Sequence, residues 1–252
     1  MHPLSVVIIT LNEERNIERC IKSVQALADE VVVVDSLSTD RTREIAQRLG
    51  ARVIEQAFLG HIEQKNFAKD QAKNDWVLSL DADEALTQAL EASISSVLEN
   101  PQYTGYRMNR LTNFCGQWIK HSGWYPDTKL RLFRKEAGRW QGTNPHDRFD
   151  LDDNAPSGFL KGDLLHYSFY TVEEHLAQIE KFSSIAAKAK FDKGESLPPI
   201  MHRIKAFAKF FKAYVLKLGF LDGYYGWVIA RNSAKATYLK YQKLHQLQRQ
   251  AS

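Results

Sequence analysis

The first 85 residues alternate short apolar runs with longer segments of mixed polarity, and this alternation constrains the fold more than any other feature. Each apolar run has the length of a buried strand and is rich in Val, Ile or Leu. The runs are LSVVIIT, EVVVVDS, ARVIEQ and DWVLSLDAD, at residues 4–10, 30–36, 51–56 and 75–83. Helices are predicted between them, so the pattern predicts a parallel sheet connected by helical crossovers.

The rest of the chain predicts a different organisation. Between residues 101 and 170, short strands such as TGYRMNR and KLRLFRK mix with Gly, Trp and His loops, which indicates an antiparallel extension of the sheet. From Val172 onward the sequence is typical of helices, with a break at GESLPP. We therefore expect an α/β domain over residues 1–170, with halves 1–100 and 101–170, and a basic helical region over residues 171–252.

Composition bounds the class of protein. The chain has 252 residues, 44% of them hydrophobic, enough for one large α/β domain with a core. Its two cysteines form no disulfide framework and no metal-ligand spacing, which fits a reducing cytosol. The N-terminus lacks the features of a signal peptide, and no apolar run reaches the ~18–20 residues that a spanning helix needs. We expect a cytoplasmic protein, soluble or peripheral to a membrane.

The net charge of +4 conceals an asymmetry along the chain. Residues 181–252 contain 14 Lys/Arg and 3 Asp/Glu, a net charge of +11, whereas residues 1–180 contain 20 and 27, a net charge of −7. A basic end on an acidic body indicates an anionic partner, which is lipid, a lipid-linked glycan or nucleic acid. The alternative is a lysine-rich, well-solvated helical tail.

The fourth apolar run ends in three acids, Asp81, Asp83 and Glu84. Ligands bind at the carboxyl ends of parallel strands, so acids there indicate a binding crevice. Asp81 and Asp83 can reach one ion, and a few oxygen ligands suit a Mg²⁺ or Mn²⁺ that also binds a diphosphate. The alternative is that these acids cap the next helix, predicted over residues 84–99. Neither a GxGxxG loop nor a P-loop is present, which argues against those nucleotide sites.

Four segments occur in the order and spacing of a known family: SVVIITLNEERNIERCIKSV, EVVVVDSLSTDRT, QKNFA and DWVLSLDADE. Together they resemble family-2 glycosyltransferases with a GT-A fold and, more narrowly, the lipopolysaccharide-core β-1,4-glucosyltransferases. The resemblance is strongest over residues 5–85 and continues through GTNPHDRF, LLHYS and KLGFLDGYYGW. It implies a Rossmann-like mixed sheet flanked by helices, with a C-terminal helical extension.

The resemblance also implies a donor site. Asp35 would accept a hydrogen bond from uracil, although it has the alternative role of capping a helix. Lys65 would offset phosphate charge, with the alternative of a solvated helix residue. The nucleotide-sugar-binding residues that the resemblance implies are Thr10, Asn12, Glu14, Asp35, Lys65, Asn66 and Asp81.

A metal site and a base follow from the same resemblance. Asp83 would ligate the metal directly, and His166 of LLHYS would complete its shell, unless this histidine is a hydrogen-bonded core residue. Asp147 in NPHDRF corresponds to the catalytic base, and His146 is the alternative base. At position 147 the family more often has Glu, so the side chain of Asp147 is shorter by one methylene group. The aromatic residues that either stack on sugars or form core are Trp118, Trp124, Tyr125 and Trp140.

The segment HRIKAFAKFFKAYVLKLGF, residues 202–220, separates apolar from basic residues. One stripe consists of Ile204, Phe207, Phe211, Tyr214, Val215 and Leu218, and the lysines opposite are Lys205, Lys209 and Lys212. A basic amphipathic helix with exposed aromatics favours an interfacial membrane helix. The alternative is an ordinary surface helix whose apolar face packs on the protein.

These observations predict a peripheral, metal-dependent, inverting glycosyltransferase that uses a UDP-sugar, with UDP-glucose as the expected donor. The implied acceptor is the inner-core heptose of lipopolysaccharide or lipooligosaccharide, linked to lipid A on the inner face of the cytoplasmic membrane. No nucleic acid is expected as partner. The alternatives are a transferase acting on a polyprenyl phosphate or another glycan, and a non-catalytic nucleotide-sugar-binding protein.

Overall fold

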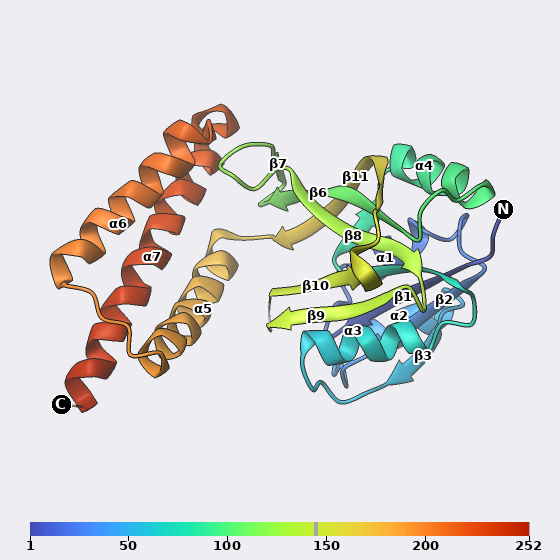
Figure 1. The fold of residues 1–252 in the computed structure, drawn as a ribbon, viewed down its shortest axis with the longest axis horizontal. Coiled ribbons are helices and arrows are strands. Elements are labelled where there is room, and N and C mark those ends of the chain that lie inside the picture. Colours follow the sequence, from blue (N-terminus) through green and yellow to red (C-terminus); the bar gives the residue numbers. More distant parts are fainter. Residues whose placement is uncertain (144–145, 252) are drawn as a thin grey trace. The chain divides into compact units, whose positions relative to one another are not determined.

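The computed structural model describes residues 1–143 and 146–251, and the chain forms two compact units. The first unit comprises Met1–Arg110 and Asp127–Tyr167, and the second comprises Leu111–Pro126 and Ser168–Ser252. The first unit contains most of the sheet, and the second is mainly helical (Figure 1).

The first unit begins with the predicted alternation of strands and helices, which is confirmed. Its elements up to the acidic strand end are β1 (Leu4–Thr10), α1 (Ile17–Lys22), β2 (Glu30–Asp35), α2 (Thr42–Arg48), β3 (Arg52–Glu55), α3 (His61–Asp70) and β4 (Trp76–Asp81). The elements that follow are β5 (Glu84–Leu86), α4 (Gln88–Glu99), β6 (Gly105–Phe114), β8 (Asp127–Arg134), β9 (Gly138–Thr143), β10 (His146–Leu151), a 3-10 turn η1 (Asp152–Asn154) and β11 (Gly158–Phe169).

The sheet is mixed, in the order β3-β2-β1-β4-β8-β6-β11-β5, and β7 (Gln117–Ile119) pairs with β6. β1 runs parallel to β2 and β4, whereas β8 is antiparallel to β4 and β6. β9 and β10 form a separate antiparallel pair. The predicted α/β architecture, a mixed sheet flanked by helices with a C-terminal helical extension, is confirmed.

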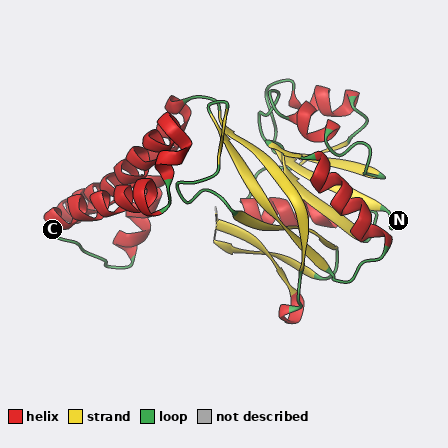
Figure 2. Ribbon diagram, turned by 90° about the horizontal axis from the view of Figure 1, so that it is seen from above, coloured by secondary structure: helices red, strands yellow, loops and turns green. Residues whose placement is uncertain are grey.

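Both faces of the central strands are buried, which explains why the sequence shows continuous apolar runs rather than alternation. Val6 and Ile8 of β1 share one core cluster with apolar residues of α1, α2 and α4. Val7 points into a second cluster with Ala68 of α3 and aromatic residues of β8, β9 and β10. Figure 2 shows helices on both sides of this sheet.

The helix predicted over residues 84–99 begins later than expected. Glu84–Leu86 form β5, which pairs with β11, and only Gln88–Glu99 are helical. Thr87 caps this helix by accepting a hydrogen bond from the Leu90 N–H. The acids at the end of β4 therefore do not cap α4, and that alternative is excluded.

The second unit consists mainly of helices that pack on one another. They are α5 (Val172–Asp192), α6 (Pro199–Phe211), a π-helical turn η2 (Lys212–Leu216), a 3-10 turn η3 (Gly219–Asp222) and α7 (Gly223–Ala251). The break predicted at GESLPP separates α5 from α6, and α7 packs against both. No helix among the described residues combines the length and the apolar character needed to cross a membrane.

Candidate active site at the carboxyl ends of the strands

The parallel strands β2, β1 and β4 are neighbours in the sheet, and their carboxyl ends lie side by side. Thr10 of β1 is in register with Asp35 of β2, and Ile9 is in register with Asp81 of β4. The pairing continues past the strands, because the Ser36 N–H donates to the Thr10 carbonyl at 2.8 Å. The structure therefore brings together strand-end residues that lie far apart in the sequence.

Asp35 ties the first two strand-end loops together. Its buried carboxylate accepts hydrogen bonds from the N–H of Ser38, at 2.8 Å, and from the Ser38 hydroxyl. The Ser38 oxygen accepts from the Asn12 N–H at 2.8 Å, and the Asn12 side-chain oxygen accepts from the Thr39 N–H at 2.8 Å. The carboxylate has no exposed surface, so a ligand reaches it only if the Ser38 turn moves.

The remaining predicted residues of the first loop differ in environment. The Thr10 hydroxyl is buried and has no hydrogen-bond partner within residues 1–143 and 146–251. Glu14 lies nearer the surface and accepts from the backbone N–H and the Nε of Arg41. Its neighbour Glu13, which the sequence did not single out, accepts a hydrogen bond from the Asn16 amide at 2.7 Å. Burial raises the pKa of Glu13 to about 7, although a hydrogen bond from Asn16 acts in the opposite direction.

Asp81 is held between two cations. Lys65 Nζ lies 3.0 Å from one Asp81 oxygen, and Arg131 Nη2 lies 2.7 Å from the other. Burial alone would raise the pKa of Asp81, but the charges of Arg131, Lys65 and Arg110 outweigh it and hold that pKa well below 3.8. The Asp81 anion is therefore compensated from within the protein.

Glu84 is compensated in the same way. Its fully buried carboxylate lies 2.8 Å from Arg131 and 3.2 Å from Arg110, which in turn lies 2.7 Å from Asp127. We call the set Lys65, Asp81, Arg131, Glu84, Arg110 and Asp127 the buried ion network. Sequence reasoning missed both arginines. The acidic strand end required a nearby positive charge, but no local spacing indicated which residues of β6 and β8 supply it.

Asp83 points to a different partner from that of Asp81. Its carboxylate lies 3.1 Å from His166 Nε2, and the two side chains are 24% and 14% exposed. The β5–β11 pairing places His166 opposite Glu84, and the Tyr167 N–H donates to the Asp83 carbonyl at 2.9 Å. Burial alone would raise the pKa of Asp83, but His166 outweighs it and holds that pKa below 3.8. The pair is partly open to solvent.

The Asp83–His166 pair fits a divalent metal ion that shares its coordination with a ligand. The described residues contain no cluster of three or more His, Cys, Asp or Glu side chains arranged to hold a metal. Mg²⁺ sites often use one or two carboxylates and fill the remaining positions with water and substrate phosphates. A carboxylate with an adjacent imidazole is compatible with such a shared site.

Lys65 also contacts the candidate base. Its Nζ lies 2.7 Å from Asp147 of β10, so one ammonium group joins Asp147 to Asp81. The Lys65 side chain is buried and lies 4.6 Å from the ring centroid of Trp140. The alternative of a solvated helix lysine is therefore wrong. His146 belongs to β10 by its backbone, but its side chain lies outside the described residues.

Asn66 and Trp140 have structural contacts. The Asn66 amide donates to the Trp140 carbonyl at 3.0 Å, and the Trp140 N–H donates to the Asn66 side-chain oxygen at 2.9 Å. Trp140 is buried against Phe133 and Phe149. Of the two alternatives for Trp140, core is therefore correct, and Asn66 fastens α3 to β9.

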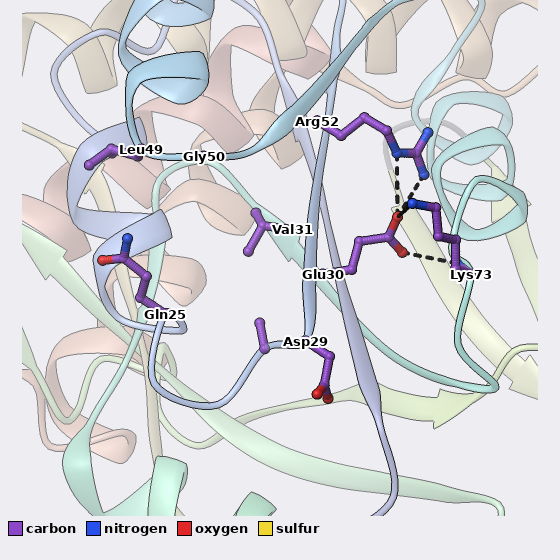
Figure 3. A pocket seen from close by; sticks show the side chains of 9 residues that line it. Gln25, Asp29, Glu30, Val31, Leu49, Gly50, Arg52 and Lys73 are labelled. Atoms are coloured by element: carbon purple, nitrogen blue, oxygen red, sulfur yellow. Dashed lines mark hydrogen bonds and ion pairs between the residues drawn. The ribbon is translucent and has the colours of Figure 1, made fainter.

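A pocket of about 330 Å³ lies away from this site, beside the amino end of β2 (Figure 3). Its most buried charge, Glu30, is already paired, because Arg52 Nη2 lies 3.0 Å away and the Lys73 N–H donates to it at 2.9 Å. We interpret this pocket as a surface depression above a structural ion pair, and not as a ligand site. The strand-end acids remain the candidate active site.

Residues 5–151 match the family described as Glycosyl transferase family 2. The match covers more than half of the chain, which therefore belongs to family 2 of the glycosyltransferases. An uncharacterized glycosyltransferase of Rickettsia typhi is 34% identical over 98% of this chain and 88% of its own length.

Two further similar proteins have more specific descriptions. The lipopolysaccharide core biosynthesis glycosyltransferase LpsC of Rhizobium meliloti is 28% identical over 97% of this chain and 92% of its own length. Among solved structures, glucosyl-3-phosphoglycerate synthase from Mycobacterium tuberculosis, in complex with Mn²⁺, UDP and glucosyl-3-phosphoglycerate, is 26% identical over 44% of each chain, with a TM-score of 0.38.

We expect Arg131→Met to lower the free energy of unfolding by about 3–5 kcal/mol, because it leaves Asp81 and Glu84 buried with too little compensating charge. Urea unfolding followed by circular dichroism measures this. Arg148→Met is the control, since Arg148 is exposed and pairs with Asp150 at the surface. That variant should lose less than about 1 kcal/mol. Equal, small losses in both variants would contradict a structural role for the network.

Glu13 predicts a stability change with pH. The folded state keeps a proton on Glu13 up to about pH 7, whereas the unfolded state loses it near 4.5. The folded state therefore binds more protons between these values, and stability falls as pH rises across them, by up to ~3 kcal/mol. Glu13→Gln should flatten this slope in urea unfolding measured in EDTA. An unchanged slope in Glu13→Gln would refute the assignment.

Proposed function

We propose that this protein is an inverting, metal-dependent glycosyltransferase that transfers glucose from UDP-glucose to the inner-core heptose of lipopolysaccharide or lipooligosaccharide. The observation that carries the proposal is the Asp83–His166 pair, partly open to solvent beside the aligned strand ends. The similarity to LpsC over nearly the whole chain supports a lipopolysaccharide core as acceptor. Such an acceptor places the enzyme at the inner face of the cytoplasmic membrane, with the basic C-terminal helices as its contact.

The first two strand-end loops would hold the nucleotide. Asn12 and Asp35 already share a hydrogen-bonded turn with Ser38, so the loops act as one unit. Uracil binding at Asp35 requires this turn to move, since the carboxylate is buried. The Thr10 hydroxyl has no hydrogen-bond partner among the described residues and is a candidate hydrogen-bond group for the donor. The proposed nucleotide-sugar-binding residues are Thr10, Asn12, Glu14, Asp35, Lys65, Asn66 and Asp81.

Asp83 and His166 would hold Mg²⁺ or Mn²⁺ together with the donor diphosphate. When bound, the ion would stabilise the negative charge that develops on the departing diphosphate. The protein residues have separate tasks around it. Asp83 and His166 supply ligands, whereas Lys65 and Arg131 keep Asp81 ionised and fixed at the end of β4.

The acceptor hydroxyl must lose a proton as the new glycosidic bond forms. A carboxylate within hydrogen-bond reach is the simplest group to take it. Asp147 is the proposed base because Lys65, whose Nζ lies 2.7 Å from the Asp147 side chain, also contacts Asp81 at the strand ends. His146 is the alternative.

The activity test is release of UDP in the presence of lipopolysaccharide acceptor and Mn²⁺ or Mg²⁺. We expect UDP-glucose to be turned over at least about tenfold faster than UDP-galactose, UDP-N-acetylglucosamine or GDP-mannose, since polar contacts to sugar hydroxyls discriminate strongly. EDTA should abolish turnover, and added metal should restore it. Full activity in EDTA would exclude the metal, and a preference for another donor would exclude glucose.

Asp147→Asn keeps the shape of the side chain but removes its basicity. We expect the transfer rate to fall by roughly 10²–10⁴, with UDP-glucose binding unchanged in calorimetry. Asp150→Asn on the same strand is the matched control, because Asp150 pairs with Arg148 at the surface, and it should be near normal. A near-normal rate in Asp147→Asn together with collapse in His146→Ala would move the base to the histidine.

A further inference from the structure

α6 presents its apolar stripe to solvent instead of packing it on the protein. Ile200, Ile204, Phe207 and Phe211 recur at spacings of four, three and four residues, so they share one helical face. All four are exposed, and Phe207 is 71% exposed. Of the thirteen residues of α6, all described, His202 alone is buried. An ordinary surface helix would bury this stripe.

The apolar surface continues through the turns that follow α6. Leu216 and Tyr224 are 65% and 68% exposed, and the other large exposed residues of the turns are Val215, Leu218, Phe220, Leu221 and Trp227. The planes of the Tyr224 and Trp227 rings are inclined by 29°, with centroids 6.4 Å apart. We call the exposed apolar residues of 200–227 the apolar tip. It extends along α6 and over η2 and η3 to the first turns of α7, and the turns between α6 and α7 lie at one end of the helical unit in Figure 1.

The turns beneath the apolar tip are fixed by polar contacts. The buried carboxylate of Asp222 accepts hydrogen bonds from the N–H groups of Lys120 and His121, at 3.1 and 2.9 Å. A Cβ on Gly226 would lie 1.8 Å from the carbonyl oxygen of Gly219, so the chain approaches itself there as closely as glycine allows. The Asp222 carboxylate is therefore satisfied inside the bend, while large apolar side chains of the same turns are exposed. The exposed apolar surface is therefore a defined structure.

The charges around the apolar tip have one sign. Residues 199–227 contain one acid, Asp222, and its carboxylate is buried. The same segment contains five basic residues, which are Arg203, Lys205, Lys209, Lys212 and Lys217. Lys205 lies against Tyr241 of α7, with its Nζ 5.1 Å from the ring centroid, so it takes part in the packing between the helices. A second copy of this surface would repel the first, whereas an anionic bilayer is complementary to it in both charge and polarity.

We infer that the apolar tip inserts into the headgroup and acyl boundary of an anionic bilayer, and that apolar insertion, more than attraction by lysines, holds the protein there. This inference rests on the proposed function, in which the acceptor is linked to a membrane. It goes further because it assigns the membrane contact to particular side chains. Aromatic residues such as Tyr224 and Trp227 favour this boundary region. Basic side chains beside the tip then reach the lipid headgroups.

The test is co-sedimentation of the full chain with phosphatidylglycerol–phosphatidylethanolamine vesicles. We expect wild type to bind and to stay bound in 0.5 M salt, because apolar insertion is not screened. The variant Phe207→Asn/Leu216→Asn/Leu221→Asn should partition at least about tenfold less. Ile185→Asn, at an exposed apolar residue of α5 outside the tip, is the matched control and should bind like wild type. Circular dichroism checks that every variant folds.

Trp227 gives a second readout that does not depend on the triple variant. Brominated lipids should quench the vesicle-bound protein, and Trp227→Phe should remove most of that quenching. Absence of vesicle binding, or binding that salt abolishes and the triple variant leaves intact, would overturn the inference. So would a dimer in sedimentation that the triple variant dissociates. Vesicle binding does not require turnover, so the two claims can fail separately. A protein that transfers sugar but does not bind vesicles would contradict the inference alone. A protein that binds vesicles but does not transfer sugar would contradict the proposed function alone.

Discussion

The contact of Arg131 with Asp81 and Glu84 is the interaction on which the rest of the site depends. Buried carboxylates are costly unless they are paired, and removal of one partner leaves a charge that water cannot reach. Arg131 lies on β8, while the other cations of the buried ion network come from α3 and β6. The network therefore fastens an antiparallel strand and a helix to the end of β4, at the point where the parallel part of the sheet meets its antiparallel extension.

This arrangement divides three neighbouring acids between two tasks. Asp81 and Glu84 are neutralised internally, whereas Asp83 turns toward His166 at a partly exposed position. A run of acids that looks uniform in the sequence thus supplies both an anchor and a candidate metal ligand. Lys65 extends the anchor to Asp147, so Asp81 and the candidate base share one cation.

Much of the first unit could be predicted from the sequence because its strands are buried on both faces and are therefore continuous apolar runs. The start of α4 could not, because Glu84–Leu86 are drawn into β5 by pairing with β11, some eighty residues later. The same limit hid Arg131 and Arg110, since their partners are distant in the chain. The apolar stripe of α6 could be predicted from the sequence. Whether it faces solvent or the protein depends on how α6 packs against α7, and the periodicity of the sequence does not determine that.

The central claim is that Asp83 and His166 form a metal site for the donor diphosphate, and Mn²⁺ binding tests it most directly. Electron paramagnetic resonance of free Mn²⁺, titrated with protein in the presence of UDP, gives the affinity without turnover. We predict that wild type and Asp150→Asn bind Mn²⁺ equally, and that Asp83→Asn and His166→Ala each weaken binding more than about tenfold. Unchanged Mn²⁺ affinity in Asp83→Asn, with the protein folded and UDP present, would contradict the account.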